Sequence, residues 1–306
     1  MTPIFKYISN YYRTAFSGIY FLLILLMVSL LIYFNYWHFL EIKLVHNGWS
    51  SFVGYYLLYL TPFAIAFFLQ PLFFDQCNYF RNRWFWIILF LAPAFFAFRV
   101  NFDLHESVIR KIWKGDEQVF WTQCLNWVVR VFVVLIPVYF FWWIKDRGKQ
   151  PFYGIKKVNS LRPYVLMLLM MIPLVAWASI QQDFQAMYPR ARILASLNLQ
   201  HPGWHYGVYV LCYGFDFVSI EFFFRGFLVL SLASICGPKC ILPMACFYCT
   251  IHFGKPMGEA ISSFWGGLLL GIVSFNTGSI WGGLLVHLGI AWLMEAGGWI
   301  GRVLVS

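Results

Sequence analysis

Long runs of apolar residues alternate with short polar stretches along the chain. The first two runs, 15–37 and 51–74, each exceed the roughly 20 residues that a helix needs to cross a bilayer core. Further apolar segments are found at about 84–98, 119–144, 164–181, 205–233, 238–253, 258–275 and 279–300. This pattern predicts an all-α fold, a polytopic transmembrane helical bundle with about eight or nine membrane-spanning helices.

The composition agrees with a membrane protein. Hydrophobic residues make up 61% of the chain and charged residues only 11%, and a soluble domain could not cover so much apolar surface. We attribute the net charge of +10 to loops on the cytoplasmic side, so the expected partner is the lipid bilayer and not nucleic acid. The seven cysteines lie mostly in or beside apolar runs, which argues against a secreted disulfide framework.

The most basic connection, residues 145–162, indicates the orientation and a division of the chain. Such loops mark the cytoplasmic side, and Lys6 and Arg13 place the N-terminus on that side too. We therefore expect a multi-pass protein of a bacterial inner (cytoplasmic) membrane with its N-terminus inside. The loop separates an N-terminal transmembrane region, 1–162, from a second transmembrane region, 163–306, which holds most of the intramembrane ionisable residues.

One segment that does not span, 103–114, is amphipathic. Its apolar residues share one helical face, and Asp103 and Glu106 have the spacing of an N-terminal capping pair. Its cationic face and Trp113 are typical of a helix that lies in the membrane interface.

Four ionisable residues of the second half are candidates for chemistry. The stretch "SIEFFFRGF", residues 219–227, places Glu221 and Arg225 four positions apart, hence on one helix face. His252 ends the run "ILPMACFYCTIH", and His287 lies within "SIWGGLLVHLG". Ionisable groups at membrane depth are costly unless they are paired or face water, and imidazoles can activate water, bind a metal or stabilise an oxyanion. The alternative is an ion pair that locks two helices together without chemistry.

These stretches resemble, in order, the three motifs of the CPBP intramembrane proteases, also called the Abi family, which includes CAAX prenyl endopeptidases. "IEFFFRGF" is similar to the first motif, Glu-Glu-x-x-x-Arg, "YCTIH" to Phe-x-x-x-His, and "TGSIWGGLLVHLGIA" to His-x-x-x-Asn. The resemblance covers residues 205–295 and makes 163–306 a CPBP/Abi-like transmembrane domain. It implies an intramembrane metalloendopeptidase with Glu221, Arg225, His252 and His287 as its catalytic residues.

Two positions depart from the family pattern. Ile220 stands where the family has the Glu that acts as general base, and Ala291 stands where it has the Asn that helps to hold the oxyanion. Three carboxylates near the motifs could compensate for the missing groups. Asp216 precedes Ile220 by four residues and Glu295 follows Ala291 by four, each on the same helical face. Glu259 follows His252 by seven residues, across a Gly-Lys-Pro break that interrupts the helical register. Each could equally be a charge near a membrane boundary, where the cost is modest.

The metal is a related question. Catalytic zinc usually takes three protein ligands and water, so Glu221, His252 and His287 are the candidate ligands of a zinc ion. The expected engagement of Glu221 with Arg225 counts against this set. Cys246-x-x-Cys249 followed by His252 also has a zinc-like spacing, but no second pair of suitable ligands accompanies it.

Two functions from different classes remain. The first is a CPBP-type endopeptidase that hydrolyses a peptide bond of a membrane-associated peptide or protein, with His252 activating water and His287 stabilising the oxyanion. The second is a catalytically silent relative that acts as a membrane scaffold or as the subunit of a membrane-protein partner, which Ile220 and Ala291 favour. A transporter is less well supported, since no matching pair of interrupted helices is evident in the two halves.

Overall fold

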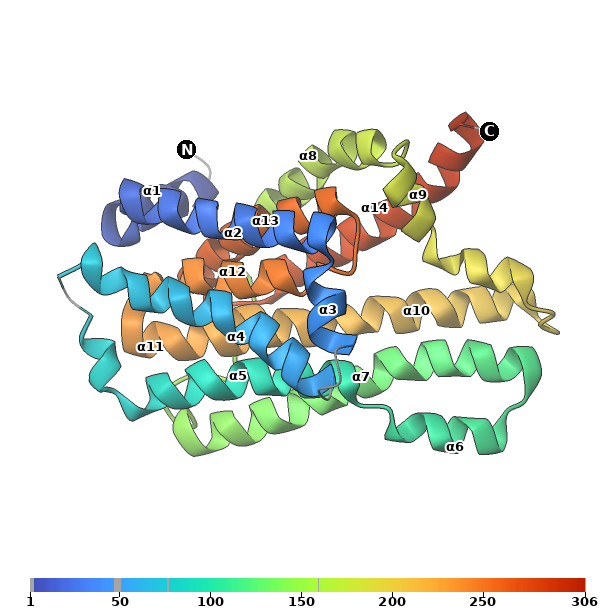
Figure 1. Cartoon of the computed structure of the whole chain (residues 1–306), viewed down its shortest axis with the longest axis horizontal. Helices are drawn as coiled ribbons and strands as arrows, with labels where there is room; N and C mark the ends of the chain where they lie inside the picture. The colour runs from blue at the N-terminus through green and yellow to red at the C-terminus, as the bar shows by residue number, and fades with distance from the viewer. Residues whose placement is uncertain (1–2, 47–50, 76, 159, 306) are drawn as a thin grey trace.

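The computed structural model describes residues 3–46, 51–75, 77–158 and 160–305, and every regular element in that part of the chain is a helix. Most of the longer helices lie side by side, roughly along the long axis of the molecule (Figure 1). The first half contains α1 (Pro3–Ala15), α2 (Gly18–His38), α3 (Leu40–His46), α4 (Ser51–Leu69), η1 (Gln70–Leu72), η2 (Asn78–Arg81), α5 (Arg83–Asn101), α6 (Leu104–Ile112) and α7 (Gly115–Lys145). The second half contains α8 (Arg162–Ala178), α9 (Gln182–Met187), η3 (Arg190–Ser196), α10 (Pro202–Glu221), η4 (Phe222–Ser231), α11 (Leu232–Cys236), η5 (Gly237–Cys240), α12 (Ile241–Thr250), α13 (Met257–Thr277) and α14 (Trp281–Val305). The predicted all-α bundle is confirmed.

Seven helical segments of the described chain are long and apolar enough to cross a membrane, where the sequence predicted eight or nine. The segment predicted at 164–181 forms α8, which is only 17 residues long. The segments predicted at 205–233 and 238–253 belong to one helical stretch, Pro202–Thr250, that turns back at η5. Its last part, α12, has 10 residues, about half the length needed to span a bilayer.

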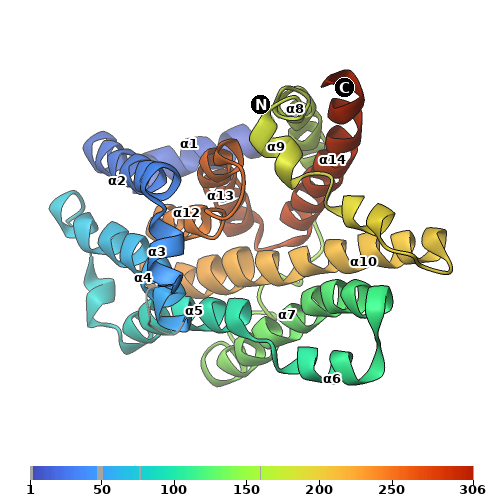
Figure 2. The same cartoon turned by 45° about the vertical axis from the view of Figure 1, so that its right-hand side comes forward.

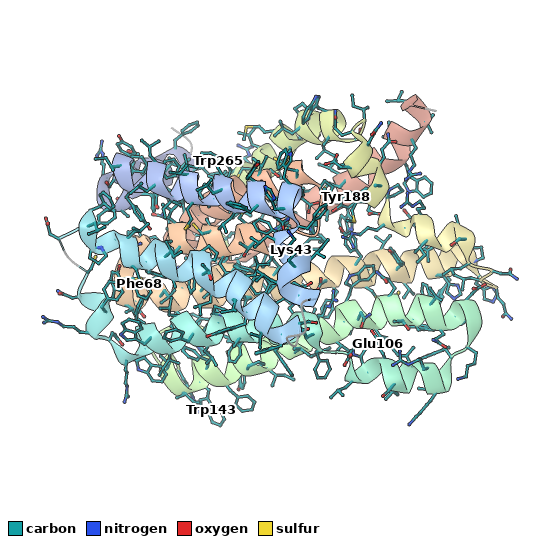
Figure 3. The ribbon with its side chains drawn as sticks, in the orientation of Figure 1. Lys43, Phe68, Glu106, Trp143, Tyr188 and Trp265 are labelled. Carbon is teal, nitrogen blue, oxygen red and sulfur yellow. The ribbon has the colours of Figure 1, made fainter. Side chains whose placement is uncertain are left out.

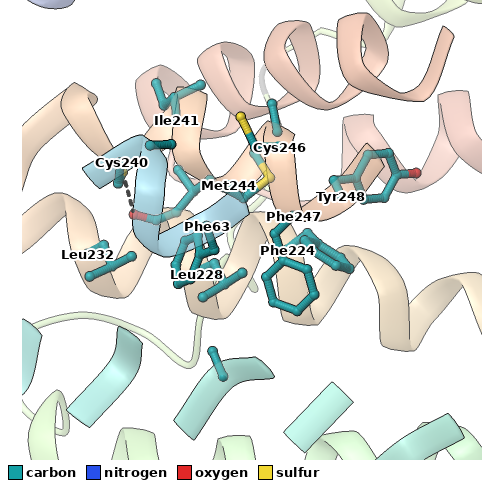
Figure 4. Close-up of a cluster of buried hydrophobic side chains, with 14 of the residues drawn as sticks. Phe63, Phe224, Leu228, Leu232, Cys240, Ile241, Met244, Cys246, Phe247 and Tyr248 are labelled. Atoms are coloured by element: carbon teal, nitrogen blue, oxygen red, sulfur yellow. Dashed lines mark hydrogen bonds between the residues drawn. The ribbon is translucent and has the colours of Figure 1, made fainter. Parts of the chain in front are cut away.

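Helices from both halves of the chain build one interior. α4 packs against α12, and α7 runs along α10, an arrangement visible from a second direction in Figure 2. Every residue of α12 is buried, as expected for a helix that is apolar all round. Aromatic rings dominate this core: Phe96 of α5 lies 5.2 Å from Phe223 and 6.0 Å from Phe247, centroid to centroid. Figure 4 shows the centre of this cluster, with Phe63 of α4 beside Phe224 and Phe247.

The outer surface of the bundle is apolar as well. Phe68 and Trp143 are each 48% exposed, and Figure 3 shows Trp143 projecting at the lower edge of the molecule. A soluble protein rarely exposes so many large apolar side chains together, whereas lipid tails accommodate them. The structure thus has the surface of an integral, multi-pass membrane protein.

Helix α6 lies where the amphipathic segment was predicted. Leu104, Val108 and Ile112 are more than half exposed, while Ile109 is buried against the bundle. The predicted capping pair is wrong: Asp103 stands at the N-cap but its side chain makes no cap hydrogen bond. The spacing of the two residues along the chain could not reveal this, because a capping hydrogen bond also requires a suitable backbone conformation at the N-cap residue.

The basic connection is anchored to the second half at one end of the bundle. Lys145 Nζ lies 2.9 Å from Asp146 Oδ1 and 3.0 Å from Ser231 Oγ, and the Tyr153 hydroxyl donates to Asp146 Oδ2 at 2.6 Å. Gly226 allows the close approach, because a Cβ there would lie 2.8 Å from the carbonyl oxygen of Tyr153. The glycine of the "RGF" stretch therefore serves the packing of this loop on η4.

Candidate functional site

The helix that carries Glu221 and Arg225 changes its winding between them. α10 ends at Glu221, and η4 continues as a π-helix of 10 residues, Phe222–Ser231. π-Helical turns are rare and often occur at functional sites. Both ionisable side chains are completely shielded from solvent, with Arg225 Nη1 3.2 Å from Glu221 Oε1. The ion pair predicted from the four-residue spacing is thus present at full burial.

His287 shares the same carboxylate oxygen. Its Nδ1 lies 3.0 Å from Glu221 Oε1, and its Nε2 lies 3.2 Å from the hydroxyl of Tyr248. An ionised carboxylate only accepts, so Nδ1 carries a proton, and the Nε2 of neutral imidazole accepts from the tyrosine hydroxyl. Gly283, one turn before His287, makes room for the carboxylate, since a Cβ there would lie 2.5 Å from Glu221 Oε2. Glu221, His287 and Tyr248 therefore form a continuous hydrogen-bonded chain across α10, α14 and α12.

Arg225 contacts this chain through the tyrosine ring. Its guanidinium carbon lies 4.1 Å from the ring centroid of Tyr248, within cation–π distance. None of its three nitrogen atoms has a hydrogen-bond partner among the described residues, so the Glu221 contact is an ion pair without hydrogen-bond geometry. The Tyr248 hydroxyl points away from the apolar cluster and toward the polar chain (Figure 4).

His252 stands in the turn between α12 and α13, with its ring against that of Tyr248. The two ring centroids are 4.8 Å apart, and His252 Nδ1 lies 2.9 Å from the carbonyl oxygen of Tyr248. A carbonyl oxygen only accepts, so Nδ1 carries the proton and Nε2 keeps its lone pair. Burial, assisted by Lys255, holds the pKa of His252 well below its ordinary value. The imidazole is therefore neutral near pH 7, with a lone pair at Nε2 to which no described side chain is bonded.

The two positions that depart from the family pattern are filled by packing. Ile220 is buried in the aromatic cluster around Phe223 and Phe224. Ala291 is buried in a second cluster, which includes Tyr213 and Phe217. Neither side chain can take up a proton or donate a hydrogen bond.

The three carboxylates considered as substitutes have other partners. Asp216 forms an ion pair with Arg99 of α5. Glu259 forms an ion pair with Lys255 and accepts a hydrogen bond from the hydroxyl of Tyr188. The remaining carboxylate, Glu295, accepts from the backbone N–H groups of residues 190 and 191, where it caps the start of η3. None of the three makes a hydrogen bond to either imidazole within the described chain.

The donor set does not fit the expected zinc ion. Both nitrogens of His287 are engaged, with Glu221 and with Tyr248, and His252 Nδ1 is engaged with the carbonyl oxygen of Tyr248. In the part of the chain that the structure describes, no three His, Cys, Asp or Glu side chains are grouped to hold a metal ion. The chemistry considered below therefore uses protein groups alone.

The first half of the chain holds the turn that bears His252, a role that the sequence did not reveal. Asn35, buried near the end of α2, donates from Nδ2 to the carbonyl oxygen of Phe253 at 3.1 Å, and its Oδ1 accepts from the backbone N–H of Glu41 at 3.1 Å. The hydroxyl of Tyr36 donates to the carbonyl oxygen of Lys255 at 2.6 Å. The only sequence signal was a polar Asn-Tyr pair at the end of the first apolar run.

Replacement of Asn35 by Ala should loosen this turn. The loss leaves the buried Phe253 carbonyl and Glu41 N–H without partners, which costs about 1–3 kcal/mol each in proteins. We expect a lower midpoint of thermal unfolding in detergent and faster hydrogen exchange at residues 251–254. Asn276→Ala is the matched control, because that amide bonds only to a carbonyl of its own helix. Equal effects of the two substitutions would contradict the conclusion that Asn35 holds the turn that bears His252.

The comparisons with known proteins concern the same part of the chain. Residues 202–293 match the family model described as type II CAAX prenyl endopeptidase Rce1-like. No curated protein and no solved structure shows significant similarity to the chain. The matched segment contains Glu221, Arg225, His252 and His287, and ends before Glu295. The resemblance to the CPBP family is confirmed for residues 202–293, which are similar to Rce1-like type II CAAX prenyl endopeptidases.

Proposed function

We propose that the chain is an intramembrane endopeptidase that hydrolyses a peptide bond at the site between α10, α12 and α14. The observation that supports this most is that two imidazoles with different hydrogen-bond partners both contact Tyr248. His252 presents an unprotonated Nε2, whereas His287 is held by an ionised carboxylate. One is prepared to take a proton and the other to stabilise charge.

In the proposed reaction, His252 Nε2 removes a proton from the attacking water as it adds to the peptide carbonyl carbon. The C–N bond then breaks, and the same proton passes to the leaving amine. The Tyr248 hydroxyl, which donates its one proton to His287 Nε2 at rest, turns that proton to the oxyanion as negative charge develops, and His287 keeps the hydroxyl in position. Glu221 accepts from His287 Nδ1 and so fixes the orientation of that imidazole, and Arg225 forms an ion pair with Glu221.

A silent scaffold is the second candidate. It is favoured by Ile220 and Ala291, whose surroundings are apolar, and by the engagement of Asp216 with Arg99. In that case the chain Glu221–His287–Tyr248 would serve only to fix α10, α12 and α14 against one another. The two candidates differ in whether His252 Nε2 acts as a general base.

Both histidines should be required for cleavage if the enzyme proposal is right. We expect His252→Ala and His287→Ala each to lower hydrolysis of membrane-anchored peptides at least 100-fold, because each removes a general base or an oxyanion partner. Purified protein in proteoliposomes would be incubated with a peptide library and the products identified by mass spectrometry. His201→Ala, an exposed histidine at the start of α10, is the control. Unchanged cleavage by folded His252→Ala protein would refute the mechanism.

Restoring a carboxylate at position 220 tests whether the site is complete. Ile220→Glu adds the base that the family motif has, so we expect faster cleavage, by about tenfold or more. Ile220→Gln is the control, because it has similar size and polarity but cannot take up a proton at neutral pH. Both variants place a polar group in an apolar cluster, so rates are compared per folded protein after size-exclusion chromatography. A parent without measurable cleavage and an active Ile220→Glu variant would support the silent relative.

The orientation in the membrane follows from the distribution of charge. The anchored basic connection and Lys239 lie at one end of the bundle, where α7 and α11 end. The turn with His252 lies one short helix, α12 of 10 residues, away from that end and beside the end of α2. By the positive-inside rule we expect the N-terminus and the basic connection in the cytoplasm.

This orientation can be tested with single cysteines introduced into a variant whose seven native cysteines have been replaced by alanine or serine. A membrane-impermeant maleimide applied to intact cells should label Gln200→Cys, before α10, and leave Ser160→Cys, in the basic connection, unlabelled until the cells are opened. Both positions are exposed, so the reagent reaches each of them once it is on the correct side. Labelling of Ser160→Cys alone in intact cells would reverse the assignment.

A further inference from the structure

Both ends of the short helix α12 are held by side-chain amides from the first half of the chain. Beyond its last residue, Asn35 Nδ2 donates to the carbonyl oxygen of Phe253. Just before its first residue, Gln70 of η1 donates from Nε2 to the carbonyl oxygen of Lys239 in η5, at 2.8 Å. The side chains of Gln70 and Asn35 are both buried. The two amides therefore bracket the helix that carries Tyr248.

Two prolines explain why these carbonyl groups take a donor from elsewhere. Pro243, in the first turn of α12, has no N–H to donate to the carbonyl of Lys239, four residues before it. Pro256 likewise has none for the carbonyl of Phe253, three residues before it, which a tight turn would otherwise use. A buried carbonyl without a donor is costly, above all where lipid excludes water. The two amides supply donors that the local sequence lacks.

The Gln70 amide is itself fixed by a buried hydrogen-bond network. Its Nε2 also donates to the hydroxyl of Tyr20, at 3.2 Å, and its Oε1 accepts from the hydroxyl of Tyr79, at 2.6 Å. The Tyr20 hydroxyl donates in turn to the carbonyl oxygen of Ala66 on α4, at 2.8 Å. Both tyrosines are buried. The network joins α2, α4, η1 and η2, so the carbonyl that Gln70 binds is held by four elements of the first half.

Helix α2 links the two bracketing amides. Tyr20, which contacts Gln70, lies in its first turn, and Asn35 lies in its last turn, 15 residues later and about 22 Å along the axis. The two carbonyl groups, of Lys239 and Phe253, are 14 residues apart, about 21 Å at the rise of an α-helix. α2 and α12 contact each other and lie close together in both Figure 1 and Figure 2. The length of α2 thus matches the length of the segment that it holds.

Apolar packing alone would not fix α12 along its axis. Every residue of α12 is buried, mostly among aliphatic and aromatic side chains, and the hydrophobic effect has no preferred direction. Hydrogen bonds depend on direction as well as on distance, so the bonds at the two ends decide how far the helix is shifted or rotated. That placement matters because the Tyr248 hydroxyl reaches His287 Nε2 at 3.2 Å, and His252 follows the last turn of α12.

We propose that Gln70 is a positioning residue for the candidate site. Together with Asn35 it sets the place of α12, and therefore the contact between the Tyr248 hydroxyl and His287 Nε2. The first half of the chain then takes part in the geometry of the site from both ends of one helix. This proposal rests on the proposed function for its effect on catalysis, whereas its effect on His287 can be measured without a substrate.

The hydrogen bond between Tyr248 and His287 reports the place of α12. In protein labelled with nitrogen-15 histidine, the Nε2 resonance of His287 is identified by its absence from His287→Ala. Gln70→Leu removes the bond to Lys239 at similar side-chain size, so we expect this resonance to move toward that of an imidazole nitrogen that accepts no hydrogen bond. Tyr79→Phe is the matched control, because it removes one bond of the same amide and leaves the bond to Lys239. Its spectrum should equal that of the parent.

The rate of peptide cleavage is the second measurement. For Gln70→Leu we expect kcat to fall at least tenfold with an unchanged KM, because a shift of about 1 Å in reacting groups can cost 100-fold and no peptide contact is removed. Tyr79→Phe should keep the parent's kcat. A purely structural role would instead lower the amount of folded Gln70→Leu protein and leave the kcat of the folded fraction unchanged.

Two results would overturn the positioning role: an unchanged His287 resonance in folded Gln70→Leu, or an equal shift in Tyr79→Phe. If Gln70→Leu does not fold, Gln70→Asn, whose amide is one methylene shorter, replaces it and must show the same shift. A shifted resonance in the variant of a parent that cleaves no peptide would refute the enzyme and leave the positioning role. Cleavage by the parent with an unshifted resonance in the variant would do the reverse.

Discussion

A carboxylate and a guanidinium that are both removed from solvent hold the second half of the molecule together. Glu221 and Arg225 are each completely buried, and removal of one partner from such a pair typically costs about 3–5 kcal/mol. Neighbouring residues provide the space and the contacts that a buried ion pair requires. Gly283 leaves space for the carboxylate, His287 donates to it, and the ring of Tyr248 lies against the guanidinium. Three helices are thus fixed by one ion pair.

The same arrangement gives the two imidazoles different hydrogen-bond partners. His287 is bound at both nitrogens and cannot rotate without breaking the chain from Glu221 to Tyr248. His252 is fixed at Nδ1 only, by the backbone of the helix that ends just before it. Asn35 and Tyr36 hold that turn from α2, so the first half of the chain contributes to the geometry of a site whose motifs lie wholly in the second. Such supporting contacts decide whether a functional group is held closely enough to act.

The departures at Ile220 and Ala291 are structural as well as chemical. Each side chain is a buried member of an apolar cluster, so both positions contribute to hydrophobic packing. The carboxylates nearby stabilise other contacts, such as the start of η3 and the ion pair with Arg99.

The sequence by itself determined the membrane class, the helical fold and the candidate residues Glu221, Arg225, His252 and His287. Hydropathy and the four-residue spacing are properties of short segments, so they can be recognised without knowing how the rest of the chain packs. Tertiary structure decided the partners. Asn35 meets Phe253 across 218 positions, and Arg99 meets Asp216 across 117, separations at which no periodicity in the chain carries information. The number of spans also depended on packing, because α12 can be short only where protein and not lipid surrounds it.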